Sequence, residues 1–225
     1  MTFTALHRAV GADPGPLSND LLTHAVTTGI TESSDLDWKS ELPPAKGMAQ
    51  TDFPKDVAAM ANSGGGVIVF GVRESQKAAI SRVDVGDFDE ACERSLRSVA
   101  ITAISPPVFG LNVYCLGAEG ERAVVVEVPA SVDGPHLIYR NECFGAPVRN
   151  DADTVWMKER QVEAAYRARF DERRHATEVL DILFADAAAG RDSETRAWLI
   201  AVAHPRIPKL RTRLTRDQGV CPDFG

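Results

Sequence analysis

The stretch FPKDVAAMANSGGGVIVFGVRE, residues 53–74, constrains the fold more than any other part of the sequence. Apolar residues at helical spacing predict a short helix at its start, with Pro54 in the first turn, where a missing N–H costs nothing. Asn and Gly tolerate the left-handed conformation, so NSGGG at 62–66 ends that helix. The next segment, VIVFGV at 67–72, is apolar throughout and rich in β-branched side chains. It therefore predicts a central strand that is covered on both faces.

The glycine run raises the question of a phosphate-binding loop, and the order of the elements argues against one. In such loops the glycines lie between a strand and the following helix, whose N-terminal N–H groups face the anion. Here the glycines follow a helix and precede a strand, so the turn meets the negative end of the helix. The run is therefore interpreted as a helix cap with close backbone packing, and the approach of a nucleic-acid backbone stays a second interpretation.

The rest of the chain predicts an α+β fold, a mixed β-sheet packed with helices and followed by C-terminal helices. Apolar periodicity predicts helices at 17–28, 87–104, 158–170 and 172–189. Strand patterns occur at 36–39, 108–116, 122–128, 136–139 and 144–149, and a hairpin turn joins the second of these to the third. The segment AWLIAVA, residues 197–203, predicts a strand or a buried helix.

Charge and composition restrict the classes of function. The net charge of −7 over 225 residues argues against a protein coated in nucleic acid. The segment HPRIPKLRTRLTR, residues 204–216, nevertheless carries five basic residues and no acid, so any nucleic-acid site must be local. The sequence lacks an apolar run of the roughly 18–20 residues that span a bilayer, and it lacks a secretory signal. We therefore expect a cytoplasmic protein with reduced cysteines and no membrane partner.

Three carboxylates flank the predicted strands. Glu32 and Asp37 lie just before and inside the strand at 36–39, and Glu74 lies just past the central strand. If the two strands are neighbours, the three acids can converge at one sheet edge, where Mg²⁺ or Mn²⁺ would offset their repulsion and activate water. The alternative is that these are surface acids, which pair with Lys39 and Arg73.

An ordered series of motifs then gives the chain a family resemblance. LDWKSELP, FPKDVAAMANSGGGVIVFGVRE, VVVEVPAS and GPHLIYRNECFGAPVRNDADT follow one another across roughly residues 30–165. This series resembles the Schlafen AlbA-type domain of bacterial proteins that are often labelled DNA-binding or ATP-binding regulators. The family pattern has an acid before E-F-K, an A-N-x-x-G-G turn, a strand ending G-V-D, and a final V-R-x-G-x-x-T.

The resemblance implies a domain organisation and, for Schlafen nucleases, a site of three carboxylates that cuts structured RNA such as tRNA. The first two acids would fall on Glu32 and Asp37, and the third falls at Arg73 or Glu74, of which only Glu74 can serve. The expected organisation is a mobile N-terminus, the Schlafen AlbA-like domain, a helical extension and a basic tail, at residues 1–16, 17–170, 171–203 and 204–225.

The primary function that follows is a regulatory nucleic-acid-binding protein, acting on tRNA or DNA and open to homodimer formation. Its predicted phosphate contacts are the basic residues Lys39, Arg73, Arg140 and Arg149. For Arg149, a structural pairing with Asp151 or Asp153 is the alternative. A Mg²⁺- or Mn²⁺-dependent endoribonuclease and an ATP-binding regulator remain as alternative functions. Solvent exposure of Tyr139 and Phe144 would favour the stacking of bases.

Overall fold

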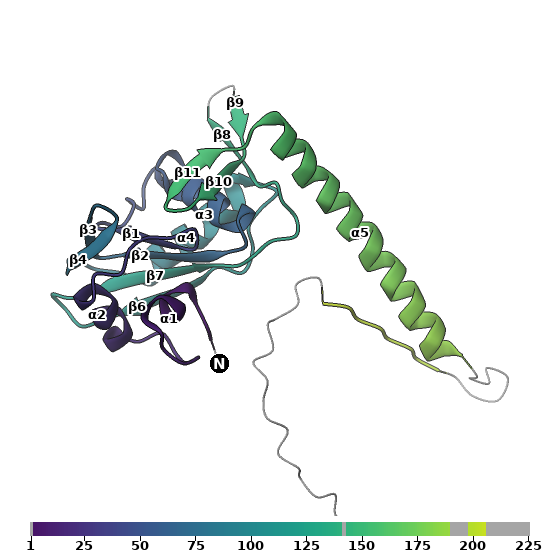
Figure 1. The fold of residues 1–225 in the computed structure, drawn as a ribbon, viewed down its shortest axis with the longest axis horizontal. Coiled ribbons are helices and arrows are strands. Elements are labelled where there is room, and N and C mark those ends of the chain that lie inside the picture. The colour runs from purple at the N-terminus through teal and green to yellow at the C-terminus, as the bar shows by residue number, and fades with distance from the viewer. Residues whose placement is uncertain (1, 141–142, 190–197, 206–225) are drawn as a thin grey trace, which may run out of the picture. The chain divides into compact units, whose positions relative to one another are not determined.

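The computed structural model of the chain describes residues 2–140, 143–189 and 198–205. It divides into two compact units, residues 1–175 and residues 176–225, and each is described by itself. The first unit contains every strand that the described residues form, together with four complete α-helices (Figure 1). The fold is α+β, as the sequence predicted.

A four-stranded sheet with the order β1-β2-β7-β6 forms the centre of the first unit. Its strands are β1 (Leu36–Lys39), β2 (Gly66–Phe70), β7 (Ala123–Val128) and β6 (Asn112–Leu116). β1 runs parallel to β2, whereas β7 is antiparallel to both of its neighbours. The strand that bears Asp37 therefore lies directly beside the central strand, which was the condition for the predicted carboxylates to meet.

Helices cover both faces of this sheet because β2 is apolar on both sides. Ile68 and Phe70 pack into a core that includes residues of α3 (Phe53–Asn62) and α4 (Glu90–Thr102). Val67 and Val69 point the other way, into a core shared with α1 (Ala5–Val10), α2 (Asn19–Thr27) and the buried Trp38. The prediction of a central strand covered on both faces is confirmed.

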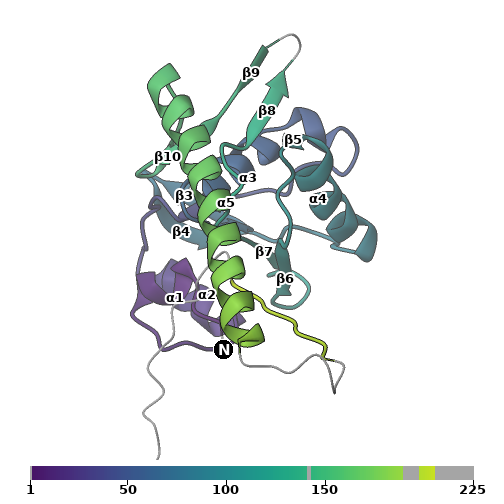
Figure 2. The same ribbon diagram turned by 90° about the vertical axis from the view of Figure 1, so that its right-hand side faces the viewer.

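Short strands extend from this framework. β3 (Val72–Ser75) and β4 (Ala78–Arg82) form one hairpin, and β10 (Pro147–Asn150) and β11 (Asp153–Trp156) form another. β5 (Ile104–Ser105), β8 (Leu137–Arg140) and β9 (Cys143–Gly145) form a three-stranded sheet, which lies near the short 3₁₀ helix η1 (Met48–Gln50). Figure 2 shows β8 and β9 projecting from the end of the unit.

The glycine turn between α3 and β2 is a site of close backbone packing. Gly65 has a φ of +90°, and a Cβ placed on it would lie 2.8 Å from the carbonyl oxygen of Val128 and 2.7 Å from the amide nitrogen of Ala130. Since both neighbours are backbone atoms, a side chain cannot be accommodated there. Gly64, with a φ of +97°, has open space around it. Gly65 therefore serves the close packing against the end of β7, whereas Gly64 is needed only for its positive φ.

The two residues that precede the glycines connect α3 to later strands. The side-chain amide of Asn62 donates to the carbonyl oxygens of His136 and Pro147, at 3.0 and 2.8 Å, and accepts from the His136 amide at 2.7 Å. The Ser63 hydroxyl accepts from the backbone amide of Arg149 at 2.8 Å. The ends of β8 and β10 are thereby fixed to the C-terminus of α3.

Three sequence predictions differ from the structure. The helices expected at 158–170 and 172–189 are one helix, α5 (Glu159–Ala188), because no Gly or Pro interrupts the junction. The predicted strand or buried helix at 197–203 is wrong for the described residues 198–203, which form neither element, and Leu199 is almost fully exposed. The expected mobile segment 1–16 contains α1, whose Leu6 is buried in the core.

Other predictions lie largely outside the described part of the chain, or concern membranes. Most of the basic tail, residues 206–225, is outside the described residues, as is residue 197. Among the helices that the structure describes, none combines the length and the apolar character needed to cross a membrane.

Candidate functional site

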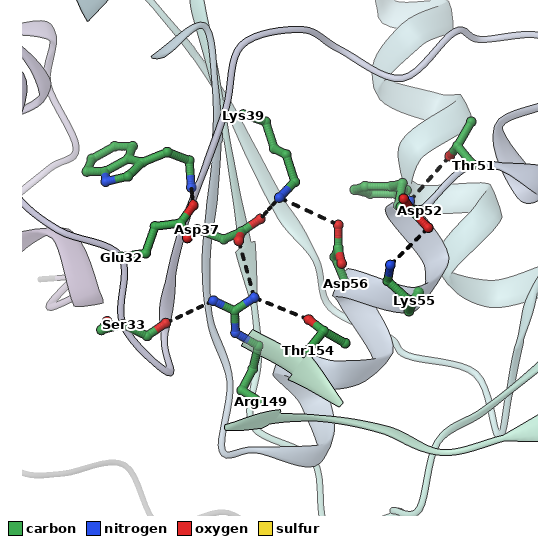
Figure 3. Close-up of polar contacts among 12 residues, drawn as sticks. Glu32, Ser33, Asp37, Lys39, Thr51, Asp52, Lys55, Asp56, Arg149 and Thr154 are labelled. Carbon is green, nitrogen blue, oxygen red and sulfur yellow. Dashed lines mark hydrogen bonds and ion pairs between the residues drawn. The ribbon is translucent and has the colours of Figure 1, made fainter. Parts of the chain in front are cut away.

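Asp37 lies at the centre of a buried cluster of charges, between β1 and β10 (Figure 3). Its Oδ1 is 3.2 Å from Nη1 of Arg149, and only 3% of each of these side chains is exposed. Its Oδ2 is 2.5 Å from Nζ of Lys39. The Arg149 guanidinium also donates to the Ser33 carbonyl at 3.0 Å and to the Thr154 hydroxyl at 3.3 Å. Two cations therefore neutralise Asp37, and β10 and β11 hold one of them in place.

A second carboxylate, Asp56 in the first turn of α3, faces the same lysine at a longer distance. Lys39 Nζ lies 3.9 Å from Asp56 Oδ2. Burial lowers the pKa of Lys39, but the attraction of Asp37 and Asp56 outweighs it, so the pKa rises above its ordinary value. Burial raises the pKa of Asp56 to about 6, because Lys39 offsets the loss of hydration only in part. Asp56 therefore titrates close to neutral pH.

Glu32 lies beside the cluster with a structural contact of its own. Its Oε1 accepts from the backbone amide of Trp38 at 3.1 Å. Burial is the main cause that raises the pKa of Glu32, and the negative charge of Asp37 adds to the rise. The two acids are therefore close enough to repel each other.

The third predicted carboxylate takes part in a different contact. Glu74 lies on β3 and its Oε2 accepts from the backbone amide of Lys77 at 2.7 Å, within the turn of the β3–β4 hairpin. Its neighbour Arg73 is exposed on the same strand, where the β3–β4 register shifts. Glu74 thus supports the turn of its own hairpin.

These contacts bear on the predicted metal site. In the part of the chain that the structure describes, no group of three or more His, Cys, Asp or Glu side chains is arranged to hold a metal ion. A cation would also have to compete with Lys39 and Arg149 for the oxygens of Asp37. The three carboxylates in this arrangement therefore do not fit a divalent ion, and we derive no metal-dependent chemistry from them.

Exposed aromatic side chains lie at a different place, on and beside the β8–β9 hairpin. Tyr139 and Phe144 are cross-strand partners whose ring centroids are 5.7 Å apart, and their exposed fractions are 60% and 64%. Trp156, which is 50% exposed, packs against the backbone of Gly145 on β9. Arg140 donates to Asp52 Oδ1 at 3.0 Å, and half of its side chain stays exposed. We call Tyr139, Arg140, Phe144 and Trp156 the aromatic platform.

A comparison with protein families shows to which family the chain belongs. A family model described as Schlafen, AlbA_2 matches residues 32–158. The chain belongs to the Schlafen AlbA_2 family. The match spans the central sheet, the buried charge cluster and the aromatic platform, so all of these features belong to the Schlafen AlbA_2 domain of this protein.

Two solved structures resemble this Schlafen AlbA_2 protein. The crystal structure of the DIP2311 protein from Corynebacterium diphtheriae has a TM-score of 0.44 and 16% identity, over 66% of this chain and 28% of that one. The N-terminal domain of a RecG-related protein from Nitrosomonas europaea has a TM-score of 0.43 and 19% identity, over 64% of this chain and 94% of that one. At these TM-scores neither likeness carries a functional argument. No curated protein matches the sequence.

Sequence reasoning identified the charged residues of the Schlafen AlbA_2 domain but not all of their partners. Arg149 pairs with Asp37, not with Asp151 or Asp153, because the pairing depends on strands 112 residues apart. Asp56 and Trp156 were not proposed as site residues, although Trp156 ends β11 and half of it is exposed. The exposure expected of a stacking surface is met at both Tyr139 and Phe144.

The buried pair gives a prediction for stability. Arg149→Met leaves Asp37 buried beside a single cation, so we expect the free energy of unfolding to fall by about 3–5 kcal/mol. Urea denaturation followed by circular dichroism measures the change. Arg94→Met is the matched control, since Arg94 forms an exposed pair with Glu90, and it should leave the stability unchanged within error. Equal effects of the two substitutions would contradict the structural role of Arg149.

The pKa of Asp56 gives a prediction for pH dependence. Its ordinary value is 3.8 and the folded value is about 6, so folding favours the protonated form. Its contribution to stability is therefore greatest below about pH 4 and is lost as the pH rises through 6. The free energy of unfolding of Asp56→Asn minus that of the wild type should therefore rise by about 3 kcal/mol from pH 4 to pH 8. Urea denaturation of both proteins at each pH measures this difference. A difference between the two proteins that does not change with pH would refute this assignment.

Proposed function

We propose that this Schlafen AlbA_2 protein binds single-stranded nucleic acid through the aromatic platform. The observation that carries the proposal is the exposure of Tyr139 and Phe144, two adjacent rings on a projecting hairpin. Large aromatic side chains normally bury their surface, so a pair left in solvent is a candidate for contact with a partner. Nucleobases suit such a pair because every base has a face that stacks on an aromatic ring.

The surroundings of the rings support the same ligand. Arg140, Phe144 and Trp156 line a hollow of about 290 Å³ on the hairpin, so a cation lies among the exposed aromatic side chains. Lys158 and Arg160 follow Trp156 in the sequence. This combination of rings and positive charge is typical of surfaces that bind single strands without strict sequence preference. It also fits a protein of net charge −7, in which a nucleic-acid site must be local.

The predicted phosphate contacts divide into two groups. Lys39 and Arg149 have their charges committed to Asp37, so they support the domain and are poorly placed to bind phosphate. Arg140 and Arg73 are both exposed. Arg140 pairs with Asp52 but half of its side chain stays open, so it is the proposed phosphate contact at the platform, whereas Arg73 lies on the β3–β4 hairpin and is not assigned a contact with the bound strand. Family membership supports a function that concerns nucleic acid, and a binding module with a regulatory role is the form that these contacts favour.

Anisotropy of fluorescein-labelled oligonucleotides tests the proposal. The probes are single-stranded DNA, single-stranded RNA and duplexes of the same sequence, at low and high salt. We expect binding of the single strands that weakens with salt. Tyr139→Ala and Phe144→Ala should each raise the Kd by about 5- to 100-fold, the loss of one stacked base.

The control is Phe170→Ala, which removes an exposed ring of similar accessibility from α5 and should leave the Kd unchanged. Equal affinity of the wild type and the two platform variants would refute the proposal. The RNA probe is also incubated with Mn²⁺ and analysed on a gel, because cleavage that Asp37→Asn abolishes would support the nuclease alternative instead.

A further inference from the structure

A second, larger hollow opens beside Tyr139. It lies where η1, the C-terminal end of α4, β5 and β8 meet, and its volume is about 610 Å³. That volume is within the range of about 300–1,000 Å³ typical of small-ligand sites. Besides two alanines, it is lined by Gln50, Thr102, Ile104, Ser105, Tyr139 and Arg140.

The lining offers hydrogen-bonding groups that are not in use. The side chains of Gln50 and Ser105 form no hydrogen bond with any residue that the structure describes. Gln50 supplies two donors and an acceptor on one amide, and Ser105 supplies a hydroxyl that donates and accepts. Thr102 donates its hydroxyl to the Ser98 carbonyl at 2.9 Å and keeps its acceptor capacity. The hollow can therefore form several directed hydrogen bonds with a neutral polar ligand.

The charges of the hollow distinguish between classes of ligand. Among the described residues that line the hollow, Arg140 alone is cationic, and Asp52 and the Thr51 carbonyl already accept from its guanidinium, at 3.0 and 3.2 Å. A phosphate group would require more uncommitted positive charge or several directed N–H donors. A wholly apolar ligand would leave Gln50 and Ser105 without partners. A flat, neutral ring with donors and acceptors on its edge satisfies these groups, and a nucleobase has that chemistry.

The hollow is continuous with the aromatic platform through one residue. Tyr139 lines the hollow and also faces Phe144 across the hairpin. A strand whose base stacks on Tyr139 therefore has its neighbouring nucleotide at the mouth of the hollow. Ile104, which is almost fully buried, supplies an apolar contact for the face of a base that enters.

We propose that this hollow takes one unstacked nucleobase of the bound single strand, and that Gln50 and Ser105 hydrogen-bond to its edge. The inference rests on the proposed function and adds a base preference to it. The platform alone stacks any base, whereas a site that pairs donors with acceptors discriminates between bases. A strand that binds to both the platform and the hollow would bind with little dependence on its sequence, except for a base preference at the one position that enters the hollow.

The test compares fluorescein-labelled homo-oligonucleotides of thymine, adenine and cytosine by anisotropy, using the full chain. The wild type should prefer one of them by about 10-fold or more. Gln50→Leu and Ser105→Ala should each reduce that preference by about 3- to 10-fold, the effect of one hydrogen bond. The Kd for the non-preferred oligonucleotides should stay within about 2-fold, since stacking is retained. Ser95→Ala on the exposed face of α4 is the matched control and should change nothing.

Two results would overturn the inference while the proposed function stands. One is a wild type that binds all three homo-oligonucleotides within about 2-fold. The other is a preference that survives both Gln50→Leu and Ser105→Ala, while Phe144→Ala still weakens binding. Failure of every single strand to bind would overturn the proposed function and this inference together.

Discussion

The buried pair of Asp37 and Arg149 connects the two ends of the domain. Asp37 lies on the first strand of the central sheet and Arg149 lies on β10, 112 residues later. Because both side chains are almost fully buried, neither can lose its partner without a large cost in hydration. Asn62 and Ser63 add hydrogen bonds from α3 to β8 and β10. The small strands that carry the exposed aromatic rings are therefore fixed to the central sheet at several points.

This arrangement assigns different roles to residues that the sequence presents together. Asp37, Lys39 and Arg149 lie within the residues that the family model matches, and their charges satisfy one another inside the domain. The Glu74 carboxylate accepts a hydrogen bond within the turn of the β3–β4 hairpin. The surface proposed for a partner is instead the exposed part of β8 and β9 and the hollow beside it. We therefore propose that the ion pair of Asp37 and Arg149 contributes to nucleic-acid binding indirectly. It helps to position the β8–β9 hairpin and does not contact the ligand.

The sequence was sufficient for the fold where the physical signal was local. Six residues of near-pure hydrophobicity after a glycine turn predicted the covered strand β2, and the family motifs predicted the α+β domain. The sequence was insufficient to predict which side chains are buried where that depends on strands far away in the chain. Whether Arg149 faces solvent or Asp37 depends on the packing of β10 on α3, and whether Tyr139 is exposed depends on what covers β8. The apolar segment at 198–203 shows the converse, since its hydrophobicity alone formed neither strand nor helix.

We propose that ligand contact occurs at the β8–β9 hairpin and not at the buried charge cluster between β1 and β10. Amide hydrogen exchange, measured with and without a saturating single-stranded oligonucleotide, tests it most directly. We expect added protection at 137–140, 143–145 and 154–157, with the exchange of 32–39 and 72–77 unchanged. Protection centred on the segments that carry Glu32, Asp37 and Glu74, with none at the hairpin, would contradict it.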